Sequence, residues 1–161
     1  MQEKIKTLLP SLRRFAFSLT GNMADADDLM QGTVERLLSK PVPDDIPIMA
    51  WTFRVCRNLW IDEYRSREIR RAATFKPELQ EQAATDEDSV VSNISLTVIS
   101  KAMNELPMQH REVLGLVAVQ GLSYQDAAAI LSVPTGTIMS RLARARSKLV
   151  TVLGLDQGVT V

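Results

Sequence analysis

Two residue types that build reactive sites are almost missing from this chain of 161 residues, which has one cysteine, Cys56, and one histidine, His110. A single cysteine excludes a disulfide within the chain and a cysteine-based zinc site, and a single histidine excludes a histidine metal cluster. No apolar run approaches the roughly 18 to 20 residues that span a bilayer. The first residues lead into an amphipathic pattern rather than a secretion signal. We therefore expect a soluble cytoplasmic protein without a metal or other cofactor.

The sequence also lacks the motifs of common enzyme sites. It has no glycine-rich phosphate loop and no plausible catalytic triad. Hydrophobic residues make up 45% of the chain and charged residues 24%, which is ordinary for a globular protein. We expect a binding protein rather than an enzyme.

The formal net charge is zero, because 19 basic residues balance 19 acidic ones, yet the two signs are separated along the chain. Residues 54–71 hold six arginines against three acids, and residues 134–150 hold four bases and no acid. Residues 78–88, in contrast, hold five acids and no base. Local asymmetry of this kind is more informative about partners than the sum. The two basic segments are therefore candidates for contact with a polyanion.

Apolar residues recur every three or four positions through most of the chain, and no alternation typical of strands persists. The stretch 72–93 is polar and acidic, which is typical of a linker. The sequence thus predicts an all-α chain of two small helical domains, residues 1–71 and 94–161, joined by a flexible linker. Helices are expected over residues 5–19, 22–38, 48–71, 94–106 and 107–119, and on both sides of a break at 132–134.

Local signals support these boundaries. Gly21 is expected to end the first helix and Asn22 to cap the second, whereas Gly32 inside the second helix costs some stability relative to alanine. The third helix is apolar on two sides, which is typical of a helix in the middle of a bundle. Cys56 on that helix is expected to be buried and inert.

Residues 123–149 carry a helix-turn-helix pattern. Ser123 and Asp126 form a capping box, and Pro134 suits the first turn of the following helix. An apolar stripe at helical spacing predicts the buried side of that second helix; it consists of Ile138, Leu142, Ala145 and Leu149. The opposite side, called the outward strip below, consists of Gly136, Ser140, Ala143, Arg144 and Ser147.

The outward strip suits contact with a DNA major groove. Its small residues let the helix backbone approach a surface, and Arg144 is long enough to reach base edges. Arg141, Arg146 and Lys148 flank the strip, where phosphates are contacted. The alternative is a solvated basic helix, but such a helix normally mixes glutamate with arginine.

Three segments resemble the extracytoplasmic-function (ECF) group of bacterial sigma-70 factors. The segment "LPMQHREVLGLVAVQGLSYQDAAAILSVPTGTIMSRLARARSKL" resembles their region 4, which reads the −35 promoter element. "DADDLMQGTVERLL" resembles region 2.2, and "AWTFRVCRNLWIDEYRSREIRR" resembles regions 2.3 and 2.4. The three segments occur in the family's order and cover most of the chain outside the linker.

The resemblance implies a protein that binds core RNA polymerase and promoter DNA, often under the control of an anti-sigma factor. Its region 4 would also rest on the polymerase flap through apolar residues around 114–119. The −35 contacts implied are Thr135, Gly136, Thr137, Met139, Ser140, Arg141, Ala143, Arg144, Arg146 and Lys148. The −10 contacts implied are Lys40, Trp51, Arg54, Arg57, Asn58 and Arg65, with the loop 40–48 near a flipped base. The contacts implied with the coiled coil of the largest polymerase subunit are Asp25, Asp28, Leu29, Gln31 and Glu35.

Alternatives remain for several of these positions. Asp25 also fits simple helix capping, and Trp51, Phe53 and Trp60 fit bundle packing as well as base stacking. Gly32 stands where the family commonly has an acid, and the loop 40–48 is rich in proline and acid, so its preferred base stays open. A sigma-mimicking module that binds an anti-sigma factor without touching DNA is the main alternative for the whole chain. An ordinary helix-turn-helix repressor is another, although it would not need the first half.

Overall fold

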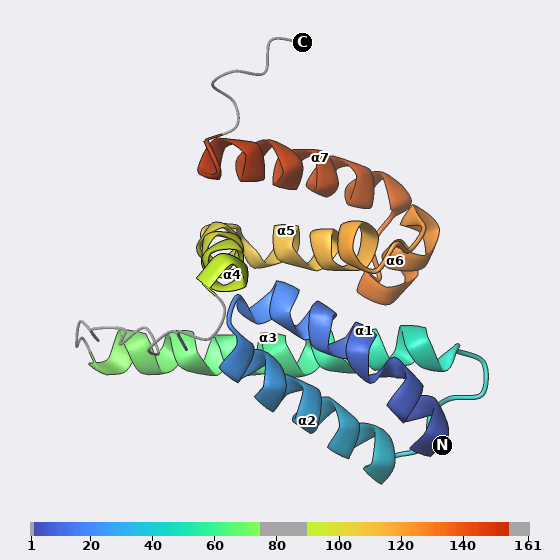
Figure 1. Ribbon diagram of the computed structural model, residues 1–161. Helices are drawn as coiled ribbons and strands as arrows, with labels where there is room; N and C mark the ends of the chain where they lie inside the picture. The colour runs from blue at the N-terminus through green and yellow to red at the C-terminus, as the bar shows by residue number, and fades with distance from the viewer. Residues whose placement is uncertain (1, 75–89, 155–161) are drawn as a thin grey trace.

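The computed structural model describes residues 2–74 and 90–154, and these residues form helices joined by short loops (Figure 1). This confirms the predicted all-α class. The first half consists of α1 (Gln2–Thr20), α2 (Met23–Ser39) and α3 (Ile48–Thr74). The second half consists of α4 (Val90–Asn104), α5 (Met108–Val113), the π-helical segment η1 (Leu114–Val119), α6 (Tyr124–Leu131) and α7 (Thr135–Val152).

The predicted helix ends are confirmed where the local signals are strong. Gly21 takes a positive φ of 77° after α1, a conformation that glycine adopts at little cost. Asn22 caps α2, because its side chain accepts a hydrogen bond of 2.8 Å from the Asp25 backbone amide. The predicted linker 72–93 is helical at both ends, since α3 continues to Thr74 and α4 begins at Val90. The rest of that linker, residues 75–89, lies outside the described residues.

Helix α3 packs against α1 and α2 within the first half and against α6 of the second half. Figure 1 shows α1 and α2 crossing in front of it. Phe53, Cys56 and Trp60 are all buried, and the Phe53 ring packs edge-on against Phe15 of α1 at 5.0 Å between centroids. Burial raises the pKa of the Cys56 thiol to about 12. Phe53 and Trp60 are therefore core residues rather than stacking platforms.

The buried core continues from the first half into the second. One hydrophobic cluster contains Phe15 of α1 and Phe53 of α3 together with Leu116 of η1 and Leu131 of α6. Helix α1 packs against η1 and α5, and α3 packs against α6. Within the described residues the two halves are thus in direct contact, whereas a flexible linker alone would not require them to touch.

A buried arginine ties three chain segments together where the halves meet. The Arg111 guanidinium donates hydrogen bonds to the backbone carbonyl oxygens of Leu106 (3.0 Å), Leu19 (2.9 Å) and Asn104 (3.0 Å). Burial lowers the pKa of Arg111, partly offset by Tyr64, but three carbonyl acceptors solvate the cation in place of water. Arg111 thereby satisfies carbonyl groups at the ends of α1 and α4.

The chain between α5 and α6 contains an irregular turn. In η1 the Gln120 amide donates to the Gly115 carbonyl at 3.0 Å, five residues back rather than four. This spacing widens the helix to a π-helix, a form that usually appears as a single turn. Leu114, Gly115 and Leu116 of this segment are buried.

Candidate nucleic-acid interface

Helix α7 has the two-sided character that its sequence predicted. Ile138, Leu142 and Ala145 are buried, and Leu149 packs partly buried against the same core. All five residues of the outward strip are exposed, and Met139 beside them is 54% exposed. Of the flanking residues, Arg146 and Lys148 are exposed and Arg141 is half-buried, as are Thr135 and Thr137 at the helix start.

The helix-turn-helix geometry that orients α7 follows from its turn residues. The Ser123 hydroxyl accepts a hydrogen bond of 3.0 Å from the Asp126 amide and caps α6. Ser132 ends α6 in the left-handed region at φ 56°, and the Val133 amide returns to the Ala128 carbonyl at 3.1 Å. Such an αL residue closes a helix C-terminus, and Pro134 then leads into α7 with extended geometry. The turn thus fixes the direction in which the outward strip faces.

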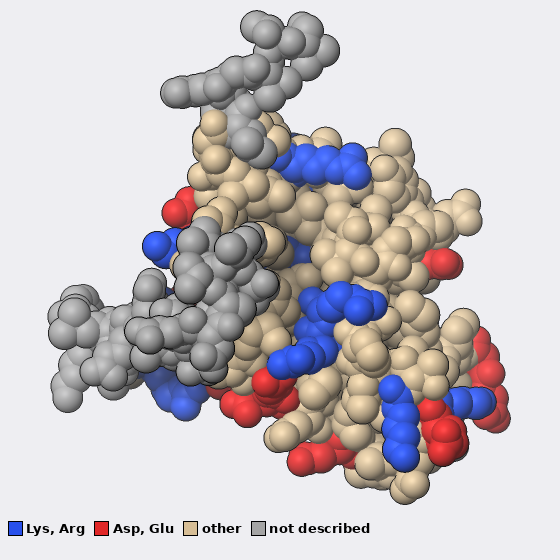
Figure 2. All heavy atoms as spheres, in the orientation of Figure 1, with Lys and Arg blue, Asp and Glu red and all other residues tan. Residues whose placement is uncertain are grey.

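The charge of α7 is not neutralised along its length. Figure 2 shows a patch of basic atoms over α7, while most of the acidic atoms on this face lie over the lower part of the molecule. The effect reaches a neighbouring helix, because the pKa of His110 is lowered by burial and then by the charges of Arg144, Arg141 and Lys148. A positively charged surface on a helix that can enter a DNA major groove attracts a polyanion.

The cations of α3 have a different environment from those of α7. Arg54 donates a hydrogen bond of 2.7 Å to the Ala129 carbonyl of α6. Arg57 forms a 2.9 Å ion pair with Glu112 of α5. Asn58, Arg65 and Lys40 are exposed and Trp51 is half-buried. The structure therefore brings two of the predicted −10 residues into contact with the second half and leaves the others outside that contact.

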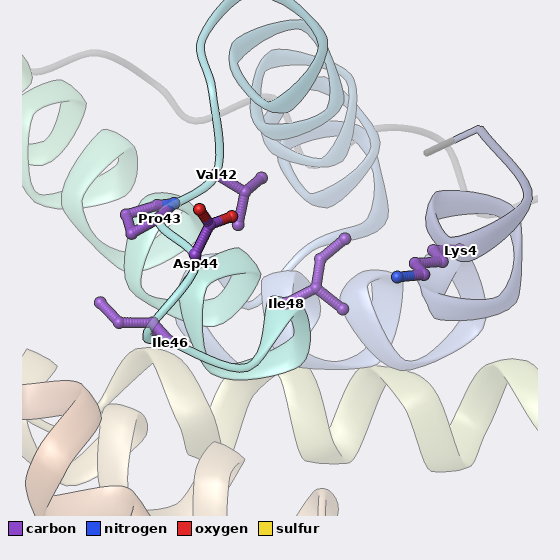
Figure 3. A pocket seen from close by; sticks show the side chains of 6 residues that line it. All are labelled: Lys4, Val42, Pro43, Asp44, Ile46 and Ile48. Atoms are coloured by element: carbon purple, nitrogen blue, oxygen red, sulfur yellow. The ribbon is translucent and has the colours of Figure 1, made fainter.

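The loop between α2 and α3 forms a small hollow with the start of α1 (Figure 3). The hollow has a volume of about 280 Å³. It is lined by four apolar residues, Val42, Pro43, Ile46 and Ile48, and by two charged ones, Asp44 and Lys4. Sequence reasoning located the loop but missed Lys4, because nothing in a surface position of α1 indicates that this residue reaches a loop some forty positions away.

The predicted polymerase contacts on the acidic helix α2 differ in their exposure to solvent. Asp28, Gln31 and Glu35 are exposed, whereas Leu29 is buried in the shared core. Asp25 accepts two hydrogen bonds from the Arg67 guanidinium of α3, at 3.0 and 3.1 Å.

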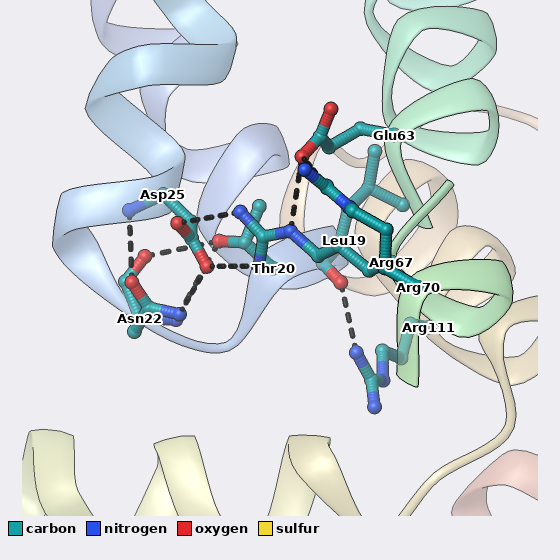
Figure 4. Close-up of polar contacts among 8 residues, drawn as sticks. All are labelled: Leu19, Thr20, Asn22, Asp25, Glu63, Arg67, Arg70 and Arg111. Atoms are coloured by element: carbon teal, nitrogen blue, oxygen red, sulfur yellow. Dashed lines mark hydrogen bonds and ion pairs between the residues drawn. The ribbon is translucent and has the colours of Figure 1, made fainter. Parts of the chain in front are cut away.

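The Asp25 pair belongs to a wider polar network (Figure 4). Arg67 also bonds Glu63 at 3.1 Å, and its guanidinium lies 5.2 Å from the Trp60 ring centroid. The hydrogen bond from Arg67 lowers the pKa of Asp25, which burial partly opposes and Asn22 reinforces. Asp25 thus has a structural role in addition to the capping that its position suggested.

Among residues 2–74 and 90–154, no helix is long and apolar enough to cross a membrane. Over the same residues, no group of three or more histidine, cysteine, aspartate or glutamate side chains is arranged to hold a metal ion.

Two protein families match the chain, one in each half. Residues 5–56 match "Sigma2 domain of PhyR" and residues 96–149 match "Sigma-70, region 4". Over 158 residues, 97% of this chain and 86% of the relative, the sequence is 37% identical to the ECF RNA polymerase sigma factor EcfG of Rhodopseudomonas palustris. It is 35% identical over 136 residues to the ECF RNA polymerase sigma factor SigL of Mycobacterium tuberculosis, covering 81% of this chain and 76% of that protein.

Solved structures resemble the whole chain as well. The sigma factor RpoE of Bartonella quintana, in complex with the anti-sigma factor NepR, matches with a TM-score of 0.77 and 30% identity, over 96% of this chain and 97% of that one. The anti-anti-sigma factor PhyR of the same organism, also complexed with NepR, matches at a TM-score of 0.64 and 20% identity, over 93% of this chain and 49% of that one. A sigma factor and an anti-anti-sigma factor thus share this fold, so the fold alone does not separate the two roles.

Proposed function

Because the chain belongs to the extracytoplasmic-function group of sigma-70 family RNA polymerase sigma factors, we propose that it binds core RNA polymerase and directs it to specific promoters. In this proposal α7 reads the −35 element in the major groove, while α3 and the loop 40–48 engage the −10 element. Neither half needs high affinity alone, because the polymerase holds both and the linker sets their effective concentration.

The observation that carries the proposal is the exposed outward strip of α7. A helix that enters a groove needs small residues facing the bases and cations at its edges. Gly136, Ser140 and Ala143 provide the first, and Arg144 adds a side chain with donors for base edges. Residues 134–150 contain no acid that would repel phosphate.

The hollow beside the loop 40–48 supports a role at the −10 element. An extruded base is stabilised by a pocket with apolar walls, which lowers the cost of unstacking. Val42, Pro43 and Ile46 supply apolar side chains on part of this hollow, and the prolines of the loop limit the entropy that it loses on binding. Asp44 repels phosphate, so we propose that this hollow contacts a base, with Lys4 as an additional donor.

We propose that the polymerase contact lies on the outer face of α2. Asp28, Gln31 and Glu35 are exposed there. Asp25 is held by Arg67, and Leu29 supports the helix from the core.

An anti-sigma factor is a further proposed partner, because solved relatives are bound to such proteins. The alternative, a sigma mimic that binds an anti-sigma factor and no promoter, predicts no need for the cations of α7. Their retention at Arg141, Arg144, Arg146 and Lys148 favours the sigma factor.

The direct test is transcription in vitro from a randomised promoter library with purified core RNA polymerase. Selective initiation upon addition of the protein is the expected result. No selection, with intact anti-sigma binding, would support the mimic instead.

A sharper test substitutes Arg144→Ala. Losing a base contact is expected to weaken or relax −35 selection by about 1–3 kcal/mol. Lys101→Ala is the matched control, because it removes an exposed cation from the same half but from α4. An equal loss on all −35 sequences would make Arg144 a phosphate contact rather than a base contact.

A further inference from the structure

The exposed side of α7 is apolar along one edge and cationic along the other. Side chains four residues apart are neighbours on a helix surface, and Met139 and Ala143 form one such pair while Arg144 and Lys148 form another. All four residues are exposed. Met139 and Arg144 are separated by about 140° around the helix axis, and Gly136 lies close to midway between them. The small residues of α7 are therefore flanked by two long side chains of different chemistry.

Met139 is a large apolar residue that faces solvent on this helix. Its side chain is 54% exposed, whereas the neighbouring Ile138 is fully buried in the core. A single exposed apolar residue is common on protein surfaces, but Met139 lies beside the cations of a segment, residues 134–150, that contains no acid. Those cations select a polyanion as the partner of this surface. An apolar side chain in the same place gains free energy only if that polyanion offers it an apolar group.

The position of Met139 along α7 suits contact with base edges. Met139 is the fifth residue of α7, which begins at Thr135, and the second helix of a helix-turn-helix contacts bases through its N-terminal residues. Gly136 and Ser140 are exposed beside it, and their small size lets the helix backbone approach the groove. In the major groove the apolar feature is the C5-methyl group of thymine. A methionine side chain has no donor and only a weak acceptor, so it distinguishes bases by that methyl group.

We infer that Met139 is the residue that specifies a thymine of the −35 element, because its flexible side chain packs, together with Ala143, against the C5-methyl group. This inference deepens the proposed function and rests on it. Met139 and Arg144 are about 7.5 Å apart along the helix axis, and they lie on opposite edges of α7. They therefore read different base pairs: one is specified by hydrogen bonds to Arg144, and the other is specified by a methyl group.

The test measures how tightly the holoenzyme, which is the full chain with purified core RNA polymerase, binds the promoter selected from the randomised library. Each thymine of the −35 element is replaced in turn by deoxyuridine, which removes the C5-methyl group and keeps the base pair. At one thymine we expect the affinity to fall about fourfold, the change that corresponds to one methyl group leaving an apolar contact. Met139→Ala and Met139→Gln are expected to bind the thymine and deoxyuridine promoters equally. Fluorescence anisotropy of the labelled promoter measures the affinity.

Val150→Ala is the matched control. Val150 is also an exposed apolar residue of α7, but it lies about three turns further along the helix, so this variant is expected to keep the fourfold effect. Because Met139 is exposed, its substitutions are expected to leave urea unfolding unchanged. Selection from the library repeated with Met139→Ala is expected to lose the preference at one base pair, and selection with Arg144→Ala is expected to lose it at a different one.

Three results would overturn the thymine contact while leaving the proposed function intact. They are a selected −35 element with no thymine on either strand, a parent holoenzyme that binds thymine and deoxyuridine promoters equally at every position, and a deoxyuridine effect that persists in both Met139 variants. Weaker binding of Met139→Ala to core polymerase without DNA would also overturn it, because Met139 would then be a protein contact. Absence of selective initiation by the parent would instead reject the proposed function, and the thymine contact with it.

Discussion

On α7 in the second half Arg144 is exposed on a strip of small residues, whereas on α3 in the first half Arg57 is half-buried and paired with Glu112. Both arginines are proposed DNA contacts on helices of similar character. The difference arises from what covers each helix: α6 and α5 lie against α3, while the outward strip of α7 faces solvent. Helical periodicity tells which side of a helix points away from its own bundle, but not whether a second bundle covers that side.

The strongest way to break this arrangement is to remove Arg111. Arg111→Ala leaves the carbonyls of Leu19, Asn104 and Leu106 without their donor. We expect a loss of about 3 kcal/mol in the free energy of unfolding, since hydrogen bonds to a charged group are worth about 1.5–3 kcal/mol each and water replaces part of them. Urea unfolding measures the loss. Arg13→Ala, which removes a half-exposed arginine paired with Asp27, is expected to cost less than about 1 kcal/mol, and equal costs would contradict the role assigned to Arg111.

Gly136→Ala tests the exposed outward strip of α7. Nothing lies within 4 Å of a Cβ added at Gly136, so the free energy of unfolding should not fall. If the small residues provide clearance for the groove, affinity of the polymerase complex for duplex DNA carrying the selected −35 element should fall about tenfold, or about 1.4 kcal/mol. Unchanged DNA affinity would show that the α7 backbone does not approach the groove at this turn.

Gly32→Ala tests how tightly α2 packs against α3 in the first half. The added Cβ makes only ordinary contact with Leu59, and alanine is the better helix former by about 1 kcal/mol. We expect stabilisation of about 0.5–1 kcal/mol in urea unfolding. Destabilisation would mean that α2 and α3 are packed more tightly than the Gly32 contact indicates.

The smallest expected effect is a pH dependence from Asp25. The hydrogen bond from Arg67 holds the pKa of Asp25 below its usual value in the folded chain, so the unfolded chain binds more protons as the pH falls. Stability from this pair is therefore present above about pH 4 and is lost as the pH falls through the folded pKa. Asp25→Asn should flatten this part of the curve of unfolding free energy against pH, and Asp28→Asn, at an exposed carboxylate of the same helix, should not. Matching curves for the parent and Asp25→Asn would remove the pair as a source of stability.

The sequence predicted those features that depend on local hydrogen bonds and helical period. The caps at Asn22 and Ser123, the glycine end at Gly21 and the buried stripe of α7 are confirmed. These depend on residues at most a few turns apart, and short-range geometry fixes them.

Features that depend on contacts between distant segments could not be read from the pattern. Lys4 at the loop hollow, the three-carbonyl role of Arg111 and the Arg57–Glu112 pair all join residues far apart in the chain. Leu29, which the resemblance places at the polymerase contact, is buried in the core of the free chain. An apolar side chain has a lower free energy in such a core than in water, which is the physical reason for its position. The residue contacts with DNA and polymerase remain predictions.

The π-helical segment η1 makes the number of residues here as important as their identity. Its wide turn holds one residue more than an α-helical turn of the same path. If the same residues were wound as an ordinary α-helix, the surplus residue would rotate α5 relative to α6 by about 100°. Arg111 and Glu112 would then leave Leu19 and Arg57, although neither side chain had changed. The number of residues in this turn therefore determines which residues of the second half face the first half.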